Sequence, residues 1–498
     1  MTPCPPLRRA RCRLVLSGLA LFLALPAAAQ SDQQRAAAFA ASLSLPRMQA
    51  DLQELQAVAD ASGGNRAAST PGHEASADYI QSQLQGLGLR TWRESIEYPV
   101  SVESSESLLL GGPGGTVIDV LQLGRHTTPP QGVQGQIVLA PDAVGCTVES
   151  WGDTVLDGRA ALVRATRDAP CGIRTQVQVA QALGAVALLT PTHPGAYKPH
   201  LLGALPALFI YGPGADEGEA ILARVAAGEH LQALVHTSYT AQTRSTFNVL
   251  AETDGEGPVI MLGAHLDSVP AGPGMDDNAS GAVAVLDVAR EAAALHLPGR
   301  LRFAWWGAEE LGLIGSSRHV EALDAAGQPA LRDIRAYLNA DMLASPNYAL
   351  GLQDPEPDGG GAAAQRMQIH AALDDYFTAM NLPRVLVSRS LAGASDHAPF
   401  RVCGLATGGV SSYVGRGDKT PEEQALFGGV AGQPYSPDYH QAGDRLENTS
   451  PVALEVLSRA MAYAMVRLAL APPPAVLTPQ CSRLELDALA GQHQLLGH

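Results

Sequence analysis

Positively charged residues are scarce in this chain of 498 residues. It contains 33 lysines and arginines against 49 aspartates and glutamates, a formal net charge of −16, and its only lysines are Lys198 and Lys419. Proteins that bind nucleic acids neutralise phosphates with a basic surface. The charge balance therefore argues against a nucleic-acid partner, and we interpret the shortage of lysine as a bias of composition without mechanistic meaning.

Long apolar runs are also rare. The run at residues 14–25 follows four arginines and precedes small residues at 27–29, which is the pattern of a signal peptide spanning residues 1–29. This run is too short to span a membrane, and the lack of a cysteine at the expected cleavage point argues against a lipid anchor. We expect a secreted or periplasmic protein without a membrane partner, and a monomer.

Cysteine is limited to six residues, of which Cys4 and Cys12 would leave with the signal peptide. Four would remain in the mature chain: Cys146, Cys171, Cys403 and Cys481. None has CxxC spacing, which argues against a thiolate zinc site. An even number in an exported chain permits disulfides. We prefer the pair Cys146–Cys171, because both lie in one short segment, and Cys403–Cys481 is the pair that remains.

In the second half of the chain, short apolar runs typical of buried strands alternate with amphipathic segments typical of helices. We predict strands at 259–264, 301–306 and 334–340, and helices at 281–295, 316–323, 368–380 and 451–468. This alternation predicts an α/β fold with a mostly parallel sheet flanked by helices on both faces. Trp305 and Trp306 are interpreted as packing residues of the second strand.

The chain length permits two or three domains. Residues 30–114, with helices predicted at 30–60 and 73–87, would belong to the same domain as residues 244–471. Short β-rich runs broken by glycine and proline fill residues 115–243 and predict an insert with its own core. Residues 472–498 start with three prolines, and we expect them to form a loose C-terminal extension.

Side chains that can bind a metal follow the predicted strands. They are His265 and Asp267 after the first strand, Glu309 and Glu310 after the second, Asp341 after the third, and Asp276 and Asp277 in a glycine-rich loop. Ligands of open α/β sheets gather beyond the carboxyl ends of the strands. One such carboxylate alone is most often a solvated loop residue, but this set favours a metal site and a metal-dependent hydrolase.

The residue types favour zinc. Imidazole and carboxylate ligands with a position left open for water are typical of a catalytic zinc site. Two metal ions also need a carboxylate between them, and the pair Asp276–Asp277 can supply that bridge.

Residues 265–316, with Tyr337-Leu-Asn-Ala-Asp-Met342, resemble the secreted di-zinc aminopeptidases of bacteria, of the leucyl aminopeptidase type. These belong to a broader family shared with glutamate carboxypeptidases and glutaminyl cyclases. Residues 427–435, Tyr439-His-Gln441 and Asp444 carry the same resemblance, and so do Gly64-Asn-Arg66 and Thr70-Pro-Gly72. The resemblance implies a zinc exopeptidase fold and peptide substrates.

Position by position, the resemblance implies five metal ligands for two zinc ions: His265, Asp277, Glu310, Asp341 and His440. Asp277 matches the bridging carboxylate. The family pattern pairs His265 with Asp341 on one ion and Glu310 with His440 on the other.

Three further residues match catalytic positions of the family. Glu309 matches the general base, which would take a proton from an activated water and deliver it to the leaving amine. Asp267 matches the carboxylate that orients His265 from behind. Tyr439 matches a phenol that stabilises the oxyanion. The resemblance thus implies an aminopeptidase that releases N-terminal, apolar residues.

The sequence departs from the family in two places. Many relatives carry a cysteine pair where this chain has Asp438 and Gly443, so one disulfide is missing. Some relatives have an arginine where this chain has Ala394, which leaves amine recognition open. Asp396 and His397, from the same motif, are candidates for lining the pocket, with a structural role as the alternative.

The insert resembles a protease-associated domain through residues 158–164, Cys171 and residues 180–188. Such a domain usually covers or restricts an active site, and a β-rich insert without a function is the alternative.

Three other functions stay open at this point. A zinc carboxypeptidase or a small-amide hydrolase could use the same fold, and arginines in the pocket would favour acidic C-terminal substrates. A non-catalytic binding protein could also keep the fold, but it would be expected to have lost ligands, and all are present here.

Overall fold

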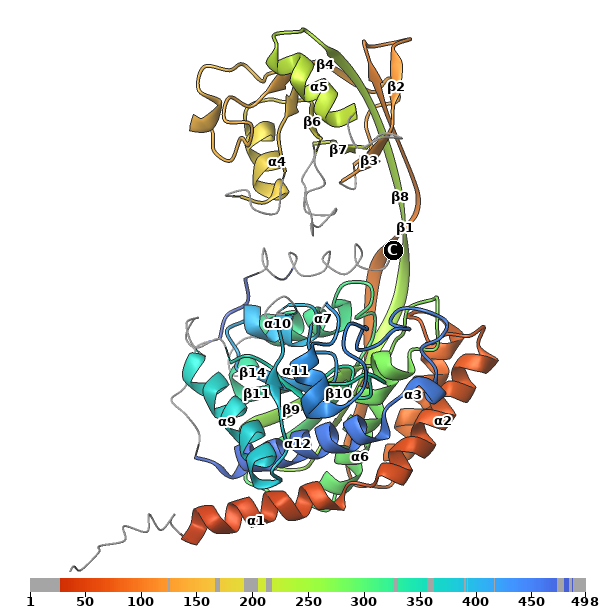
Figure 1. The fold of residues 1–498 in the computed structure, drawn as a ribbon, viewed down its shortest axis with the longest axis vertical. Coiled ribbons are helices and arrows are strands. Elements are labelled where there is room, and N and C mark those ends of the chain that lie inside the picture. The colour runs from red at the N-terminus through yellow and green to blue at the C-terminus, as the bar shows by residue number, and fades with distance from the viewer. Residues whose placement is uncertain are drawn as a thin grey trace, which may run out of the picture.

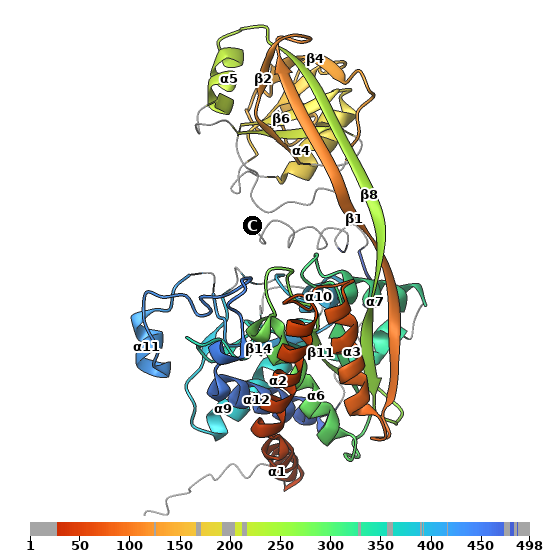
Figure 2. The same cartoon turned by 90° about the vertical axis from the view of Figure 1, so that its right-hand side faces the viewer.

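The computed structural model of the chain shows two lobes joined by a long two-stranded ribbon (Figures 1 and 2). It describes residues 27–482 and Leu486, except 124–125, 166–170, 192–204, 212–216, 327–329, 356–361, 389–390, 392, 416 and 473–478. The predicted signal peptide lies outside the described residues apart from its last three, which begin helix α1 (Ala27–Ser42). Among the described helices, none is long and apolar enough to cross a membrane.

The larger lobe is built on a sheet whose central strands are parallel. Its strands, in spatial order, are β13 (Val385–Leu386), β12 (Gly351–Leu352), β14 (Thr407–Ser411), β11 (Ile334–Ala340), β9 (Val259–His265), β10 (Arg300–Trp306) and β8 (Gln232–Glu252). From β14 to β10 every pairing is parallel, whereas β12 and β8 pair antiparallel on either side. This arrangement confirms the predicted α/β fold with a mostly parallel sheet.

The central strands are buried on both faces, which is why their sequences read as continuous apolar runs. In β9, Ile260 and Leu262 contribute to one core cluster and Met261 to the other. In β10, Trp305 and Trp306 are fully buried on opposite faces. The prediction that both tryptophans are packing residues is confirmed.

Helices cover both faces of this sheet (Figure 1). The core on one face includes α1, α2 (Leu45–Ala61), α3 (Pro71–Leu84), α6 (Ser280–Ala292), α9 (Ala363–Ala379) and α12 (Pro451–Leu470). The core on the other face includes α7 (Ile314–Ala325), α8 (Ala330–Asp333) and α10 (His397–Val402). Helix α11 (Pro421–Phe427) buries none of its residues.

Several of these helices start where the sequence supplies a capping hydroxyl. The side chains of Ser44, Thr70 and Ser450 accept the N–H of the residue three positions later, and a proline occupies the first or second position of each helix. A hydroxyl cap followed by proline satisfies the free N–H groups of the first turn. These signals explain why the starts of α3 and α12 could be predicted to within a few residues, whereas no start was predicted for α2 within residues 30–60.

The ribbon that joins the lobes was not predicted. It consists of β1 (Arg90–Leu110) and β8, which pair antiparallel along their whole length, with a register shift between Ser101 and Glu103. Both strands run from one lobe into the other (Figure 2). Because the chain enters and leaves the smaller lobe within these strands, no loop marks its borders, and the boundaries at 115 and 243 stay predictions.

The smaller lobe has its own core. It contains β2 (Thr116–Ile118), β3 (Val120–Gln122), β4 (Val133–Leu139), β5 (Ala160–Leu162), β6 (Ala187–Thr190), β7 (Ala207–Ile210), α4 (Ile173–Ala182) and α5 (Glu217–Ala226). Strands β4 to β7 are parallel, and two apolar clusters lie on either side of them. The likeness of this lobe to a protease-associated domain stays a prediction.

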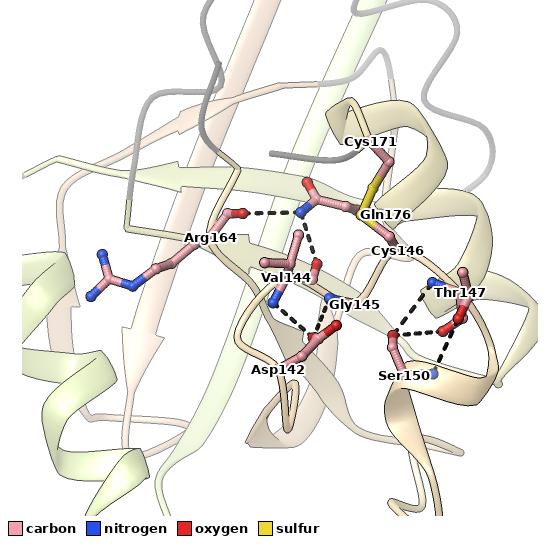
Figure 3. The surroundings of a disulfide bond; sticks show 9 residues. All are labelled: Asp142, Val144, Gly145, Cys146, Thr147, Ser150, Arg164, Cys171 and Gln176. Atoms are coloured by element: carbon pink, nitrogen blue, oxygen red, sulfur yellow. Dashed lines mark hydrogen bonds between the residues drawn. A yellow bond between two sulfur atoms is a disulfide. The ribbon is translucent and has the colours of Figure 1, made fainter. Parts of the chain in front are cut away.

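A disulfide between Cys146 and Cys171 holds one end of the smaller lobe, as predicted. Beside it, the amide of Gln176 donates to the carbonyl oxygens of Val144 and Arg164, at 2.8 and 3.0 Å (Figure 3). The disulfide thus joins the loop before β5 to the start of helix α4, and the amide joins the segments on both sides of β5 to that helix.

The second predicted disulfide, Cys403–Cys481, also forms, and it corrects the expectation of a loose C-terminal extension. The N–H of Gln480 donates to the carbonyl of Cys403 at 3.0 Å, and Leu486 is buried in the core beneath α7, α8 and α10. The described part of the tail is therefore packed against the larger lobe.

Replacing both Cys403 and Cys481 with serine is expected to lower the free energy of unfolding. The bond closes a loop of 78 residues, for which the loss of chain entropy in the unfolded state predicts about 4 kcal/mol. Urea unfolding followed by tryptophan fluorescence measures the loss, with Trp151 replaced by phenylalanine in all variants so that the smaller lobe does not contribute from its core. A loss below about 1 kcal/mol would contradict the prediction, and the double serine variant of Cys146 and Cys171 is the matched control.

Candidate metal centre

The candidate ligands meet at one edge of the parallel sheet. His265 is the last residue of β9, Asp341 directly follows β11, and Glu309 and Glu310 follow β10 after a short turn. Strand β9 lies between β10 and β11 and runs parallel to both, so the three carboxyl ends lie side by side. The structure therefore brings together the side chains that the sequence placed after separate strands.

Asp277 lies at the centre of the group, in the turn η3 (Met275–Ala279). Its Oδ1 is 3.1 Å from Nε2 of His265, and its Oδ2 is 3.1 Å from Nε2 of His440. Oδ1 of Asp341 lies 3.5 Å from Nε2 of His265, and Oε2 of Glu310 lies 3.1 Å from Nε2 of His440. The carboxylate of Asp277 thus stands between two imidazoles, each with one further acid beside it.

These contacts define two overlapping sets of donor atoms. One set is His265, Asp277 and Asp341, and the other is Asp277, Glu310 and His440, with the donor atoms of each set within 4.8 Å of one another. This is the pairing that the family pattern implied, with Asp277 shared. A third set of His265, Glu309 and Glu310 overlaps the first two.

The donor atoms of these sets are suited to bind metal cations. Within the described part of the chain, Oε1 of Glu310, Oδ1 of Asp341 and Nε2 of His440 are buried and have no hydrogen-bond partner. Buried polar atoms without partners are rare in folded proteins, because their desolvation is not compensated. Carboxylate and imidazole groups are also the ligands that zinc takes from proteins. The residues present are therefore suited to hold metal ions.

The electrostatics of the cluster lead to the same conclusion. Burial raises the pKa of Glu310 to about 7, and that of Glu309 well above its usual range. Burial also disfavours the charge of Asp277, but a hydrogen bond to His265 and the nearby imidazole of His440 bring its pKa below the usual range. Buried carboxylates packed this closely destabilise the folded protein unless positive charge compensates them.

Asp267 has a different set of partners from the one expected. Its carboxylate accepts the N–H groups of Glu309 and Glu310 at 3.1 and 3.3 Å. The ring Nδ1 of His265 lies 3.0 Å from the backbone carbonyl of Asp267 and 3.8 Å from its carboxylate. Asp267 therefore supports His265 through its carbonyl, and its side chain holds the loop of the two glutamates.

The same loop is held from the ribbon side by Asn248 of β8. Its Oδ1 accepts the N–H of Gly307 at 3.1 Å, and its Nδ2 donates to the carbonyl of Gly315 at 3.0 Å. Ala308, next to Glu309, has a positive φ, and so do Met342 and His440 beside or within the ligand set. Non-glycine residues in this conformation cluster at functional sites.

Tyr439 lines the same pocket as the ligands. Its ring stacks on His440, with 3.8 Å between ring centroids, and on Tyr413 at 5.6 Å. Burial and the neighbouring carboxylates raise the pKa of Tyr439 well above its usual value. The phenol thus keeps its proton at neutral pH and can donate a hydrogen bond.

A chain of hydrogen bonds behind Asp341 was missed from the sequence. The phenol of Tyr337 donates to Oδ1 of Asn339 at 3.0 Å, and Nδ2 of Asn339 donates to Oγ of Ser395 at 2.8 Å. Ser395 in turn donates to Oδ2 of Asp341 at 2.5 Å. The sequence signal was the motif at residues 395–400, which predicted pocket residues but not this role.

Of the two other residues singled out in that motif, His397 lines the pocket and Asp396 does not. Asp396 is fully buried and accepts a hydrogen bond from Ser316 at 2.5 Å, so its contacts are structural. The pocket wall has an apolar part, made of Met342, Val387, Leu391, Val410 and Tyr413. It also has a polar part, made of Gln353, Asp354, Arg366, His397 and Arg401.

Comparison with known proteins agrees with this geometry. A model described as Peptidase family M28 matches residues 248–465, which include all five candidate ligands. Over 445 residues the chain is 34% identical to the probable lipoprotein aminopeptidase LpqL of Mycobacterium tuberculosis, and the match covers 86% of this chain and 87% of that protein. The chain belongs to peptidase family M28. The family together with its aminopeptidase relatives shows a metallo-exopeptidase, as the sequence predicted.

Solved structures share the fold. The aminopeptidase from Aneurinibacillus sp. strain AM-1 matches 91% of this M28 chain and 98% of its own, with a TM-score of 0.63 and 21% identity. BSAP, a zinc aminopeptidase from Bacillus subtilis, matches 88% of this chain and 98% of its own, with a TM-score of 0.53 and 20% identity. The likeness extends over both lobes, since it covers most of the chain.

The loop that carries His440 in this M28 chain is linked by a side chain at the two positions where the sequence departs from the family pattern, Asp438 and Gly443. Nδ2 of Asn448 donates to Oδ2 of Asp438 at 3.2 Å and to the carbonyl of Gly443 at 2.8 Å. Asn448 therefore links these two positions.

Proposed function

We propose that this protein is an exported, zinc-dependent aminopeptidase that removes apolar N-terminal residues from peptides. The observation that carries the proposal is the pair of donor sets that share Asp277, with Glu309 directly beside them. His265, Asp277 and Asp341 would hold one zinc ion, and Asp277, Glu310 and His440 the other. The aminopeptidase names of the relatives and the zinc named for BSAP support the same function.

Each residue of the site would have its own role in the reaction. When bound, the zinc ions would supply an activated water and polarise the scissile carbonyl. Glu309 would accept a proton from the attacking water and return it to the leaving amine. Tyr439, which keeps its proton, would donate a hydrogen bond to the oxyanion. Asp267 would keep Glu309 in place through the backbone N–H of that residue.

The pocket wall supports an apolar N-terminal residue, because its apolar part can bury a leucine or phenylalanine side chain. Arg366 and Arg401 in the same wall favour a second candidate, a carboxypeptidase that binds an acidic C-terminal residue. Export is supported by the pattern at residues 1–29 and by the disulfides Cys146–Cys171 and Cys403–Cys481.

The test compares leucine p-nitroanilide with its N-acetylated form, using purified mature protein after chelation and after zinc is returned. Cleavage of the free amine only, restored by zinc, is the expected result. If two zinc ions bind but neither compound is cleaved, peptides with acidic C-terminal residues become the substrates to test. If no zinc binds, the assignment of the site is wrong.

A further inference from the structure

Asp444 is a buried acid next to the candidate metal centre, but its carboxylate does not belong to either donor set. Oδ1 accepts the N–H of Asp276 at 2.7 Å, and Oδ2 accepts the N–H of Asp277 at 3.0 Å. The backbone carbonyl of Asp444 accepts the N–H of Met275 at 3.1 Å. Three consecutive N–H groups of the turn η3 therefore point at this one residue, which is only 3% exposed.

These bonds join two ligands that are far apart in the sequence. Asp444 lies in the loop that carries His440, four residues further on, whereas Asp277 is 167 positions away from it. Both ligands belong to the same donor set. Both oxygens of the Asp444 carboxylate and its backbone carbonyl each accept one N–H of the turn, which links the two loops at three points. Asp444 can thus fix the position of Asp277 relative to His440.

Arg66 holds the same turn from the other side. It is fully buried, and it donates to the carbonyl oxygens of Pro273 at 2.9 Å, of Gly274 at 2.7 Å and of Leu266. Pro273 and Gly274 precede the turn η3, and Leu266 follows His265. Gly274 has φ +65°, and a Cβ there would lie 2.3 Å from the carbonyl oxygen of Asp277, so this backbone is tightly enclosed.

We propose that Asp444 is a positioning residue that raises the zinc affinity of the site formed by Asp277, Glu310 and His440. This inference rests on the proposed function, because it assumes that these residues hold zinc. Asp444 acts through the backbone of the turn and touches neither the metal nor the substrate. Without its carboxylate, two N–H groups lose their acceptors and the turn can move away from His440.

Partners that orient metal ligands typically change metal affinity about 10- to 100-fold when they are replaced. Asp444→Asn keeps one acceptor oxygen but turns an NH₂ group towards the other backbone N–H. We expect this variant to bind the zinc ion of the site formed by Asp277, Glu310 and His440 about 10- to 100-fold less tightly than the wild type does. At saturating zinc its kcat should return to within about threefold of the wild-type value, because the reacting groups are unchanged.

Glu447→Gln is the matched control. It removes the same charge from the same region, but Glu447 is exposed and forms an ion pair with Arg445 at 3.4 Å. Zinc affinities are measured by competition with a chromogenic chelator, and the metal-free proteins are melted in parallel. The expected result is a loss of affinity in Asp444→Asn only, with metal-free melting temperatures that stay close to the wild-type value.

An affinity in Asp444→Asn equal to that of the control would overturn the proposal. If the asparagine variant does not fold, Asp444→Ser, whose hydroxyl can accept one N–H, takes its place. If both variants stay unfolded with zinc present, Asp444 is a requirement of the fold and the proposal is wrong. A wild-type protein that binds no zinc would instead contradict the proposed function, so the two failures are distinguishable.

Discussion

Replacing Glu309 with glutamine is expected to lower kcat about 10²- to 10⁴-fold, the contribution usual for a general acid–base residue. Glutamine has nearly the shape of glutamate but cannot accept the proton of the attacking water. The two donor sets that share Asp277 do not include Glu309. The variant should therefore keep both zinc ions, and KM should change little.

The control is Glu310→Gln, which makes the same substitution one residue later. Glu310 lies 3.1 Å from His440 and belongs to a donor set, so this variant should lose zinc instead. Zinc content and kcat are measured on the same samples. If Glu309→Gln keeps more than about a tenth of the wild-type kcat, the role assigned to Glu309 is wrong.

Removing the zinc is expected to abolish hydrolysis and to change how stability depends on pH. In the metal-free protein, burial raises the pKa of Glu310 to about 7 and of Asp396 to about 8, from usual values near 4. Between pH 6.5 and 8 the folded state then binds more protons than the unfolded state. The free energy of unfolding of the metal-free protein should therefore fall as pH rises through this range.

Two histidines contribute to this balance in different ways. Burial lowers the pKa of His440, but the carboxylates of Asp277 and Glu310 beside it outweigh burial and raise that pKa to about 10, so its stabilisation is also lost as pH rises towards 10. Burial lowers the pKa of His73 to about 3, which makes stability rise with pH, but only below its unfolded pKa near 6.5. Well above pH 6.5 the contribution of His73 no longer changes with pH, and the contributions of Glu310, Asp396 and His440 all fall.

Bound zinc should stabilise the folded protein more strongly as pH rises, which is the opposite of the trend in the metal-free protein. Metal ions compete with protons for the same ligands, so they bind more tightly as pH rises. At a zinc concentration 100 times the dissociation constant, each site stabilises the folded state by about 2.7 kcal/mol. Melting temperatures at pH 6.5 and 8, with zinc and with a chelator, measure both effects. A metal-free protein that melts higher at pH 8 than at pH 6.5 would contradict this prediction.

The long ribbon shows where reasoning from sequence failed and why. Residues 101–106 of strand β1 are rich in serine and glutamate and show no apolar alternation. A ribbon between two lobes has little to pack against, so no face of it needs apolar residues. The pattern that normally reveals a strand is therefore missing.

The sequence by itself determined the α/β fold and the candidate ligands after β9, β10 and β11, because a strand buried on both faces must be apolar and the first polar residues after parallel strands must meet at one edge. His440 was predicted only through the family resemblance. The tertiary structure decided everything that depends on burial. It placed Arg66, Asp444, Asn248 and Ser395 as supports of the ligand loops, and it attached the tail through Cys481 and Leu486. These residues are polar or isolated in the sequence, and only the folded chain brings their partners within hydrogen-bonding distance.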